Sequence, residues 1–139
     1  MLDARVLVTV ASIVSAFALT TMMFRIQREL AQREQGLPTY IAWSDWLLLS
    51  AMVGCMLFVV VPLVSTEQLP PLLLRVPGAF CCAAAFLVVG YIFGILAHYR
   101  LLFWRGHGKT PHVPGEPAER VIVVFFGAVA LAAFVRIVL

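Results

Sequence analysis

Four long apolar runs constrain this chain more than any other feature of its sequence. They cover residues 6–24, 46–64, 76–97 and 121–139. The first three contain no charged residue, and the fourth contains only Arg136, close to its end. A helix rises about 1.5 Å per residue, so a run of about 20 residues matches the roughly 30 Å hydrocarbon core of a bilayer. The pattern predicts four transmembrane helices.

The composition agrees with lipid as the main solvent. Of 139 residues, 63% are hydrophobic and 12% are charged, and the mean hydropathy is +1.00. These values exclude a disordered chain, and a soluble domain of this size has too little interior to hide so much apolar surface. We therefore expect an all-α fold: one membrane domain over residues 1–139, a four-helix bundle made of two antiparallel transmembrane hairpins.

The connections differ in length and charge. We expect polar connections at about 25–45 and 98–120 and a short hairpin at 65–75. Helix-forming residues continue after residue 24, and Glu29 with Arg33 forms a favourable i, i+4 pair, so the first helix should extend a few turns into water. Gly36 and Pro38 then end it. Several glycines and prolines in 98–120 predict a loop.

The basic residues predict the orientation in the membrane. Seven of the ten Lys and Arg residues lie in the two long connections, and three lie on the opposite side. The positive-inside rule places the long connections in the cytoplasm and both termini outside. The composition suggests a bacterial cytoplasmic (inner) membrane. The first apolar run continues through the small residues at 16–18, so we expect a helix that is not cleaved as a signal peptide.

Small and hydroxyl residues mark faces where helices can pack. Gly90 and Gly94 form a GxxxG pair, which allows another backbone to approach closely. The neighbour is either a helix of the same chain, which we favour, or another subunit. A second set of small polar residues lies on the first helix and consists of Thr9, Ser12, Ser15 and Thr20.

Residues that carry chemistry are scarce in the spans. No Asp, Glu, Lys or His lies at the centre of any span, which argues against a proton relay through the bundle. We interpret Asp45, at the start of the second span, as a helix cap or the partner of a cytoplasmic arginine. Core packing explains Cys55, Cys81 and Cys82 better than metal binding does. We predict no catalytic, cofactor-binding or metal-binding residue.

A basic and aromatic segment follows the third span. Its candidate docking residues are Arg100, Trp104, Arg105 and Lys109. The formal net charge is +3, and at the mouth of a span such residues anchor a chain to anionic lipid or meet a partner protein. We do not expect a nucleic-acid ligand.

Three hypotheses for function follow. The first is a non-enzymatic accessory or assembly subunit of a larger membrane complex that acts through helix packing. The second is a small homo-oligomeric channel or transporter. The third is a membrane enzyme that uses Asp45, His98 or His112 at the cytoplasmic face. No pattern in the sequence resembles a known family closely enough to name one.

Overall fold

The computed structural model describes residues 3–36, 42–65, 70, 75–98 and 117–139. Among these residues it contains four helical spans, each long and apolar enough to cross a membrane. The elements are α1 (Ala4–Glu34), a second span made of α2 (Asp45–Cys55), η1 (Met56–Val60) and α3 (Val61–Ser65), then α4 (Arg75–His98) and α5 (Pro117–Val138). The predicted all-α four-helix membrane bundle is confirmed.

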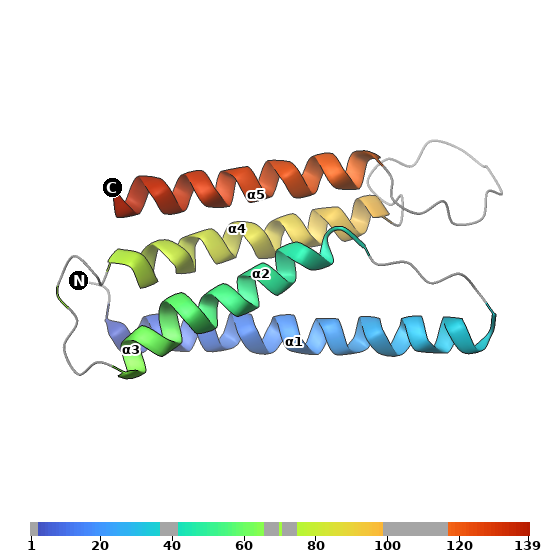
Figure 1. The fold of residues 1–139 in the computed structure, drawn as a ribbon, viewed down its shortest axis with the longest axis horizontal. Helices are drawn as coiled ribbons and strands as arrows, with labels where there is room; N and C mark the ends of the chain where they lie inside the picture. The colour runs from blue at the N-terminus through green and yellow to red at the C-terminus, as the bar shows by residue number, and fades with distance from the viewer. Residues whose placement is uncertain (1–2, 37–41, 66–69, 71–74, 99–116) are drawn as a thin grey trace.

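The spans form two antiparallel hairpins. Helix α1 packs against the second span, and α4 packs along α5 (Figure 1). The two hairpins meet mainly where α2 lies against α4. Both chain ends marked in Figure 1 lie at the same end of the bundle, while the starts of α2 and α5 lie at the other. At that second end, the end of α4 lies near the starts of α2 and α5.

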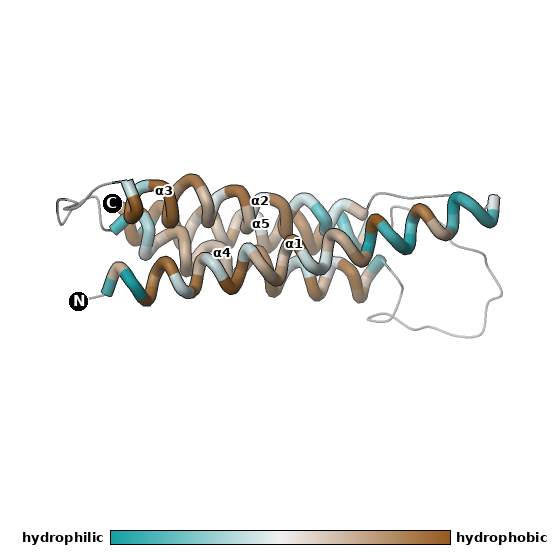
Figure 2. Tube along the Cα trace, turned by 90° about the horizontal axis from the view of Figure 1, so that it is seen from below, coloured by the Kyte–Doolittle hydropathy of each residue, from teal (hydrophilic) through white to brown (hydrophobic). Residues whose placement is uncertain are grey.

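Helix α1 is longer than the bundle. Its apolar part packs through Leu7, Ala11, Ser15 and Ala18, which are buried. Its carboxyl end projects past the start of α2 and carries mostly hydrophilic residues (Figure 2). The helix ends at Glu34, ten residues after the predicted span ends at residue 24, and Gly36 follows with a φ of 72°. The positive φ explains why glycine stands at this helix end.

The second span is not a uniform α-helix. Residues Met56–Val60 form a π-helical turn in which the amide of Val61 donates to the carbonyl of Met56. Pro62 follows, and a proline has no amide hydrogen to donate to the carbonyl four residues earlier. A π turn inside an α-helix absorbs such an interruption and lets the span continue.

The last span begins before the predicted position. Residues 117–120 form the first turn of α5, whereas the sequence analysis assigned them to the connection 98–120. Pro117 starts the helix, where its missing amide hydrogen costs nothing. The predicted hairpin 65–75 and the remainder of the connection 98–120 lie mainly outside the described residues.

The bundle has one buried core that is rich in small residues, and its outer faces are apolar. Its buried cluster contains Leu47, Leu48 and Val59 together with several alanines, and it involves all four spans. Many large apolar side chains point outward, including Ile13, Phe24 and Val124. In a membrane these faces contact lipid, so helix association depends on close packing and polar contacts rather than on removing apolar surface from water.

Candidate functional site

A buried carboxylate joins three helices at one end of the bundle. Glu119, in the first turn of α5, has no exposed surface. Its Oε1 accepts hydrogen bonds from the backbone amide of Ser44, at 2.9 Å, and from the Ser44 hydroxyl, at 3.0 Å. Its Oε2 lies 2.9 Å from Nδ1 of His98. We call Ser44, His98 and Glu119 the Glu119 cluster.

Helix ends position the Glu119 cluster. Ser44 directly precedes α2, His98 is the last residue of α4, and Glu119 lies three residues into α5. Amides at a helix start lack partners within the helix, and they attract negative charge; a helix end favours a cation. The carboxylate of Glu119 therefore lies where the helix dipole of α5 stabilises its charge.

Close packing of α4 brings the cluster together. A Cβ atom at Gly94 would lie only 2.7 Å from Cβ of Ser44. Real Cβ atoms do not approach so closely, so glycine at position 94 lets Ser44 lie against α4 while it contacts Glu119. Gly90 similarly lies against Phe126 of α5 and Leu47 of α2. The GxxxG pair thus contacts helices of its own chain.

An ion pair extends the polar region to the remaining helix. Nε of Arg25 in α1 lies 3.2 Å from Oδ1 of Asp45 in α2, with only 14% and 17% of the two side chains exposed. The contact is ionic, because Asp45 Oδ1 has no hydrogen-bond partner among the described residues. It agrees with the predicted pairing of Asp45 with an arginine. Asp45 is the neighbour of Ser44 in the chain, so this ion pair links α1 to the same end of the second span that contacts Glu119. Polar contacts therefore join all four spans at this end of the bundle.

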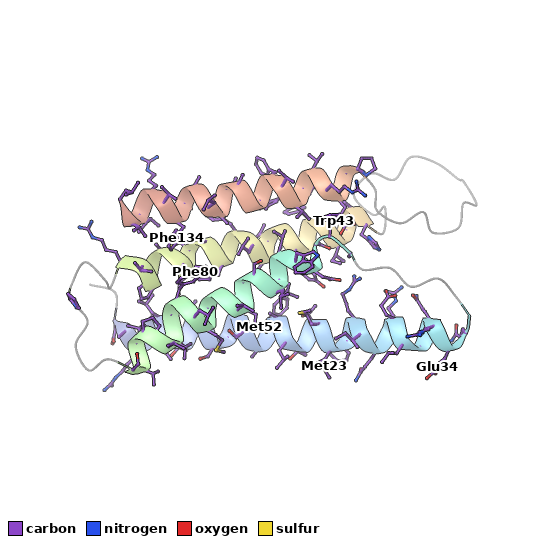
Figure 3. The ribbon with its side chains drawn as sticks, in the orientation of Figure 1. Met23, Glu34, Trp43, Met52, Phe80 and Phe134 are labelled. Atoms are coloured by element: carbon purple, nitrogen blue, oxygen red, sulfur yellow. The ribbon has the colours of Figure 1, made fainter. Side chains whose placement is uncertain are left out.

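Aromatic and basic side chains surround the polar contacts. The guanidinium carbon of Arg120 lies 5.3 Å from the centre of the Trp43 ring, a cation–π contact between the starts of α5 and α2. Figure 3 labels Trp43 at the start of α2 and shows Glu34 farther out, at the end of α1. Trp43 and Trp46 are 47% and 59% exposed. Exposed tryptophans at this position suit the boundary between lipid and water.

The Ser44 hydroxyl and the His98 imidazole both contact Glu119. The hydroxyl of Ser44 donates to Glu119, whereas a serine nucleophile would donate to an imidazole. The Nδ1 atom of His98 also faces Glu119. Among the described residues, no group of three or more His, Cys, Asp or Glu side chains is arranged to hold a metal ion. The site can hold the charge of a carboxylate and fix helix ends.

The structure separates several residues that the sequence analysis grouped. Ser15 is buried inside the bundle, whereas Thr9, Ser12 and Thr20 are exposed. All three cysteines carry free thiols, with Cys55 buried, Cys81 partly buried and Cys82 exposed.

The predicted docking residues Arg100, Trp104, Arg105 and Lys109, and also His112, lie outside the described residues.

The sequence analysis missed the central acceptor of this site. It placed Glu119 in the polar connection at about 98–120. Ser44 occupies the cap position of α2, but its side chain makes no capping hydrogen bond. The available signal was the hairpin itself: His98 ends one span and Glu119 stands just before the next apolar run, so antiparallel packing brings the two residues to the same level.

Comparisons with known proteins do not supply a family for this chain. No family model, curated protein sequence or solved structure matches it.

Proposed function

We propose that this small membrane protein is a non-enzymatic accessory or assembly subunit of a larger membrane complex, and that it acts through helix packing. One observation carries the proposal: the polar groups of the Glu119 cluster bind one another. Glu119 is fully buried and accepts bonds from helices α2 and α4. Polar groups used in this way stabilise a scaffold.

The arrangement of Asp45 and His98 also supports a non-enzymatic role. Both residues belonged to the hypothesis of an enzyme at the membrane face, and each now has a neighbour in the chain: Asp45 lies beside Arg25, and His98 lies beside Glu119. A general acid or base must reach its substrate, and the full burial of Glu119 opposes such access.

The proposed location is the bacterial cytoplasmic membrane with both termini outside. The support is the distribution of basic residues along the sequence: seven of ten lie in the connections predicted at 25–45 and 98–120. In this orientation the cytoplasmic face offers the larger polar surface. Its candidate contacts for a partner or for anionic lipid are Arg100, Trp104, Arg105 and Lys109.

The test is recovery of the intact protein from its native membrane in lipid-preserving polymer particles. Quantitative mass spectrometry should find another membrane protein in a fixed ratio. A double charge reversal, R105E/K109E, should reduce that recovery, whereas Arg5→Glu on the opposite side should leave it unchanged. Recovery of no partner in a reproducible ratio from any growth condition would contradict the proposal.

A homo-oligomeric channel or transporter is the second candidate, and one observation favours it. Thr9, Ser12 and Thr20 are exposed on α1, where copies of the chain could place hydroxyl groups around a common axis. The hydroxyl of Thr9 donates to the carbonyl of Arg5, as helical threonines do in apolar surroundings. A defined homo-oligomer in native mass measurements together with solute flux into vesicles would support this candidate; a monomer without flux would remove it.

A further inference from the structure

An exposed stripe of residues runs along α1, apart from the side that packs in the bundle. Its members are spaced alternately by four and three positions, and every one of them is exposed: Ser12, Ala16, Leu19, Met23, Ile26, Leu30 and Arg33. This is the spacing of the a and d positions of a heptad repeat, which form the contact face of a helix in a coiled coil. We call these residues the outer stripe.

The outer stripe continues past the membrane boundary. Arg25 contacts Asp45 at the start of α2, and beyond this level α1 consists mainly of hydrophilic residues (Figure 2). The two large apolar residues in that part of the helix, Ile26 and Leu30, both belong to the outer stripe and are 50% and 53% exposed. Leu30 lies about 7.5 Å beyond Arg25 along the helix axis. Lipid tails do not explain an apolar stripe that extends so far into the polar region.

The other exposed apolar side of α1 ends where the membrane ends. Val10, Phe17 and Phe24 lie on that side, seven positions apart, and all three are exposed. Beyond Phe24 this side carries Arg28 and the small residue Ala31. A side that contacts only lipid needs no large apolar residue outside the membrane, whereas a side that packs against another helix does. The outer stripe has the second pattern.

The position of α1 makes the outer stripe accessible to a second copy of the chain. Helix α1 lies at one edge of the bundle and α5 at the other (Figure 1). Copies with the same orientation in the membrane bring their α1 helices together in parallel and in register. Small residues then face small residues in the first part of the outer stripe, where helices approach closely, and large apolar residues face each other in the second part.

The charges at the end of the outer stripe favour a second copy over a different partner. Arg33 is the last residue of the stripe, at a d position, and Glu34 follows it at an e position. Both are exposed, and neither forms an ion pair with any residue that the structure describes. In a parallel coiled coil the long side chain of Arg33 extends outward beside Glu34 of the second copy, and the symmetric contact forms as well. The surface is therefore complementary to itself.

We propose that the outer stripe is the contact between two copies of this chain, which join through a parallel coiled coil of α1 helices that extends from the membrane into water. The inference goes beyond the proposed function, because it concerns contact of the chain with itself. It holds whether or not another membrane protein also binds.

Disulfide cross-linking in native membranes tests this contact. The native cysteines are replaced by alanine, and Leu30→Cys is compared with Ala31→Cys; both positions are exposed and lie at nearly the same depth. In a parallel coiled coil, residue 30 of one copy lies opposite residue 30 of the other, within reach of a disulfide. A mild oxidant should link most Leu30→Cys chains into dimers. Ala31→Cys, one position off the outer stripe, should stay mostly monomeric.

Native mass measurement in lipid-preserving polymer particles is the second test, and it begins with the wild-type chain. The wild type should have the mass of a dimer. The double substitution I26E/L30E places charges on the outer stripe, and neither side chain belongs to the buried core, so the variant should fold and lose the dimer mass. Ala31→Glu is the matched control and should keep it.

Three results would overturn the proposal: a monomeric wild type, equal cross-linking at positions 30 and 31, or a disulfide from position 30 to a different protein. The first would mean that lipid headgroups cover the outer stripe, and the last would mean that a partner protein does. Recovery of the dimer without any other membrane protein would contradict the proposed function alone, because cross-linking between copies involves no further partner.

Discussion

At the scale of single residues, the cost of burying Glu119 is met by its contacts. A carboxylate without surface exposure is unfavourable in an apolar environment unless donors and an opposite charge surround it. Here three donor contacts reach its two oxygens, from one amide, one hydroxyl and one imidazole. Hydrogen bonds to a charged acceptor are stronger than bonds between neutral groups. Each donor should therefore have a measurable effect on stability.

Ser44→Ala tests the hydroxyl donor. The substitution removes the 3.0 Å bond to Glu119 and leaves the backbone amide bond in place. We expect the free energy of unfolding to fall by about 1–2 kcal/mol, measured by reversible denaturation in lipid bicelles. Ser50→Ala is the matched control, because Ser50 belongs to the same helix and is exposed; its effect should stay within about 0.5 kcal/mol. Equal effects of the two substitutions would disprove the assigned role of Ser44.

Gly54→Ala tests the closest packing in the bundle. A Cβ atom at Gly54 would lie 1.9 Å from Cζ of Phe80, so the ring must move. It has little space, since its centroid lies 5.3 Å from that of Phe58 and 6.2 Å from that of Phe134. We expect a destabilisation of about 1–3 kcal/mol in the same denaturation measurement.

The control for this substitution is Gly127→Ala, where no atom lies within 4 Å of the added Cβ. Alanine is the better helix former, so Gly127→Ala should be neutral or stabilising by up to about 1 kcal/mol. Phe80→Leu should recover part of the stability lost in Gly54→Ala, because the smaller side chain frees the space. A Gly54→Ala protein as stable as Gly127→Ala would show that the Phe80 ring moves freely.

At the scale of helices, sequence patterns predict the existence of each span better than its ends and irregularities. Long apolar runs, interrupted only by Arg136 in the fourth, identify all four spans. A helix suits lipid because its backbone groups bond within the helix. The start of α5 at Pro117 depends on a proline that also favours turns, so the sequence alone left it in the loop. The π turn at Met56–Val60 follows from Pro62 together with tertiary packing, and apolar periodicity contains no signal for it.

In the candidate site, too, the sequence predicts some contacts and leaves out those that depend on tertiary packing. From charge and chain position, Asp45 was expected to be either a helix cap or the partner of an arginine, and the structure places Arg25 beside it. The role of Glu119 depends on how α2 lies across the α4–α5 hairpin, which involves residues 75 positions apart in the chain. No local pattern specifies such a contact.

The attachment of α5 gives a prediction at this scale. Helix α5 packs mainly on α4, and its Phe134 ring also lies near Phe80 and Phe58, at the end of the bundle opposite Trp43 (Figure 3). Phe134→Ala should destabilise the protein by about 1–3 kcal/mol, since the cavity loses contacts that lipid does not replace. Phe125→Ala is the matched control on the same helix; its ring is 59% exposed and should contribute less than about 1 kcal/mol. Both losses of unfolding free energy are measured by denaturation in bicelles. Equal losses would mean that α5 is rotated about its own axis relative to the arrangement described here.

At the scale of the whole molecule, the two ends of the bundle are built differently. One end is joined by ion pairs and hydrogen bonds between residues at helix ends, and the other by rings of η1, α4 and α5. Charged groups are tolerated near the membrane boundary, where water and headgroups are close, and they are expensive at the centre of the bilayer. The polar end also carries the hydrophilic end of α1 and, among the described residues, Arg25, Arg28, Arg33 and Arg120, so the molecule is polarised along the bundle axis.

This polarity predicts the orientation of the protein. Seven of the ten basic residues lie in the two connections predicted from the sequence at 25–45 and 98–120, so the polar end should face the cytoplasm, while Asp3 and the carboxyl terminus should lie outside. The measurement uses Asp3→Cys and Glu34→Cys in chains whose native cysteines are replaced by alanine; both positions are exposed. A membrane-impermeant maleimide should label residue 3 on intact cells and residue 34 only after the cells are opened. The reverse pattern would mean that Arg5, next to the first span, controls insertion in place of the cations in the long connections, and the proposed docking face would then lie outside the cell.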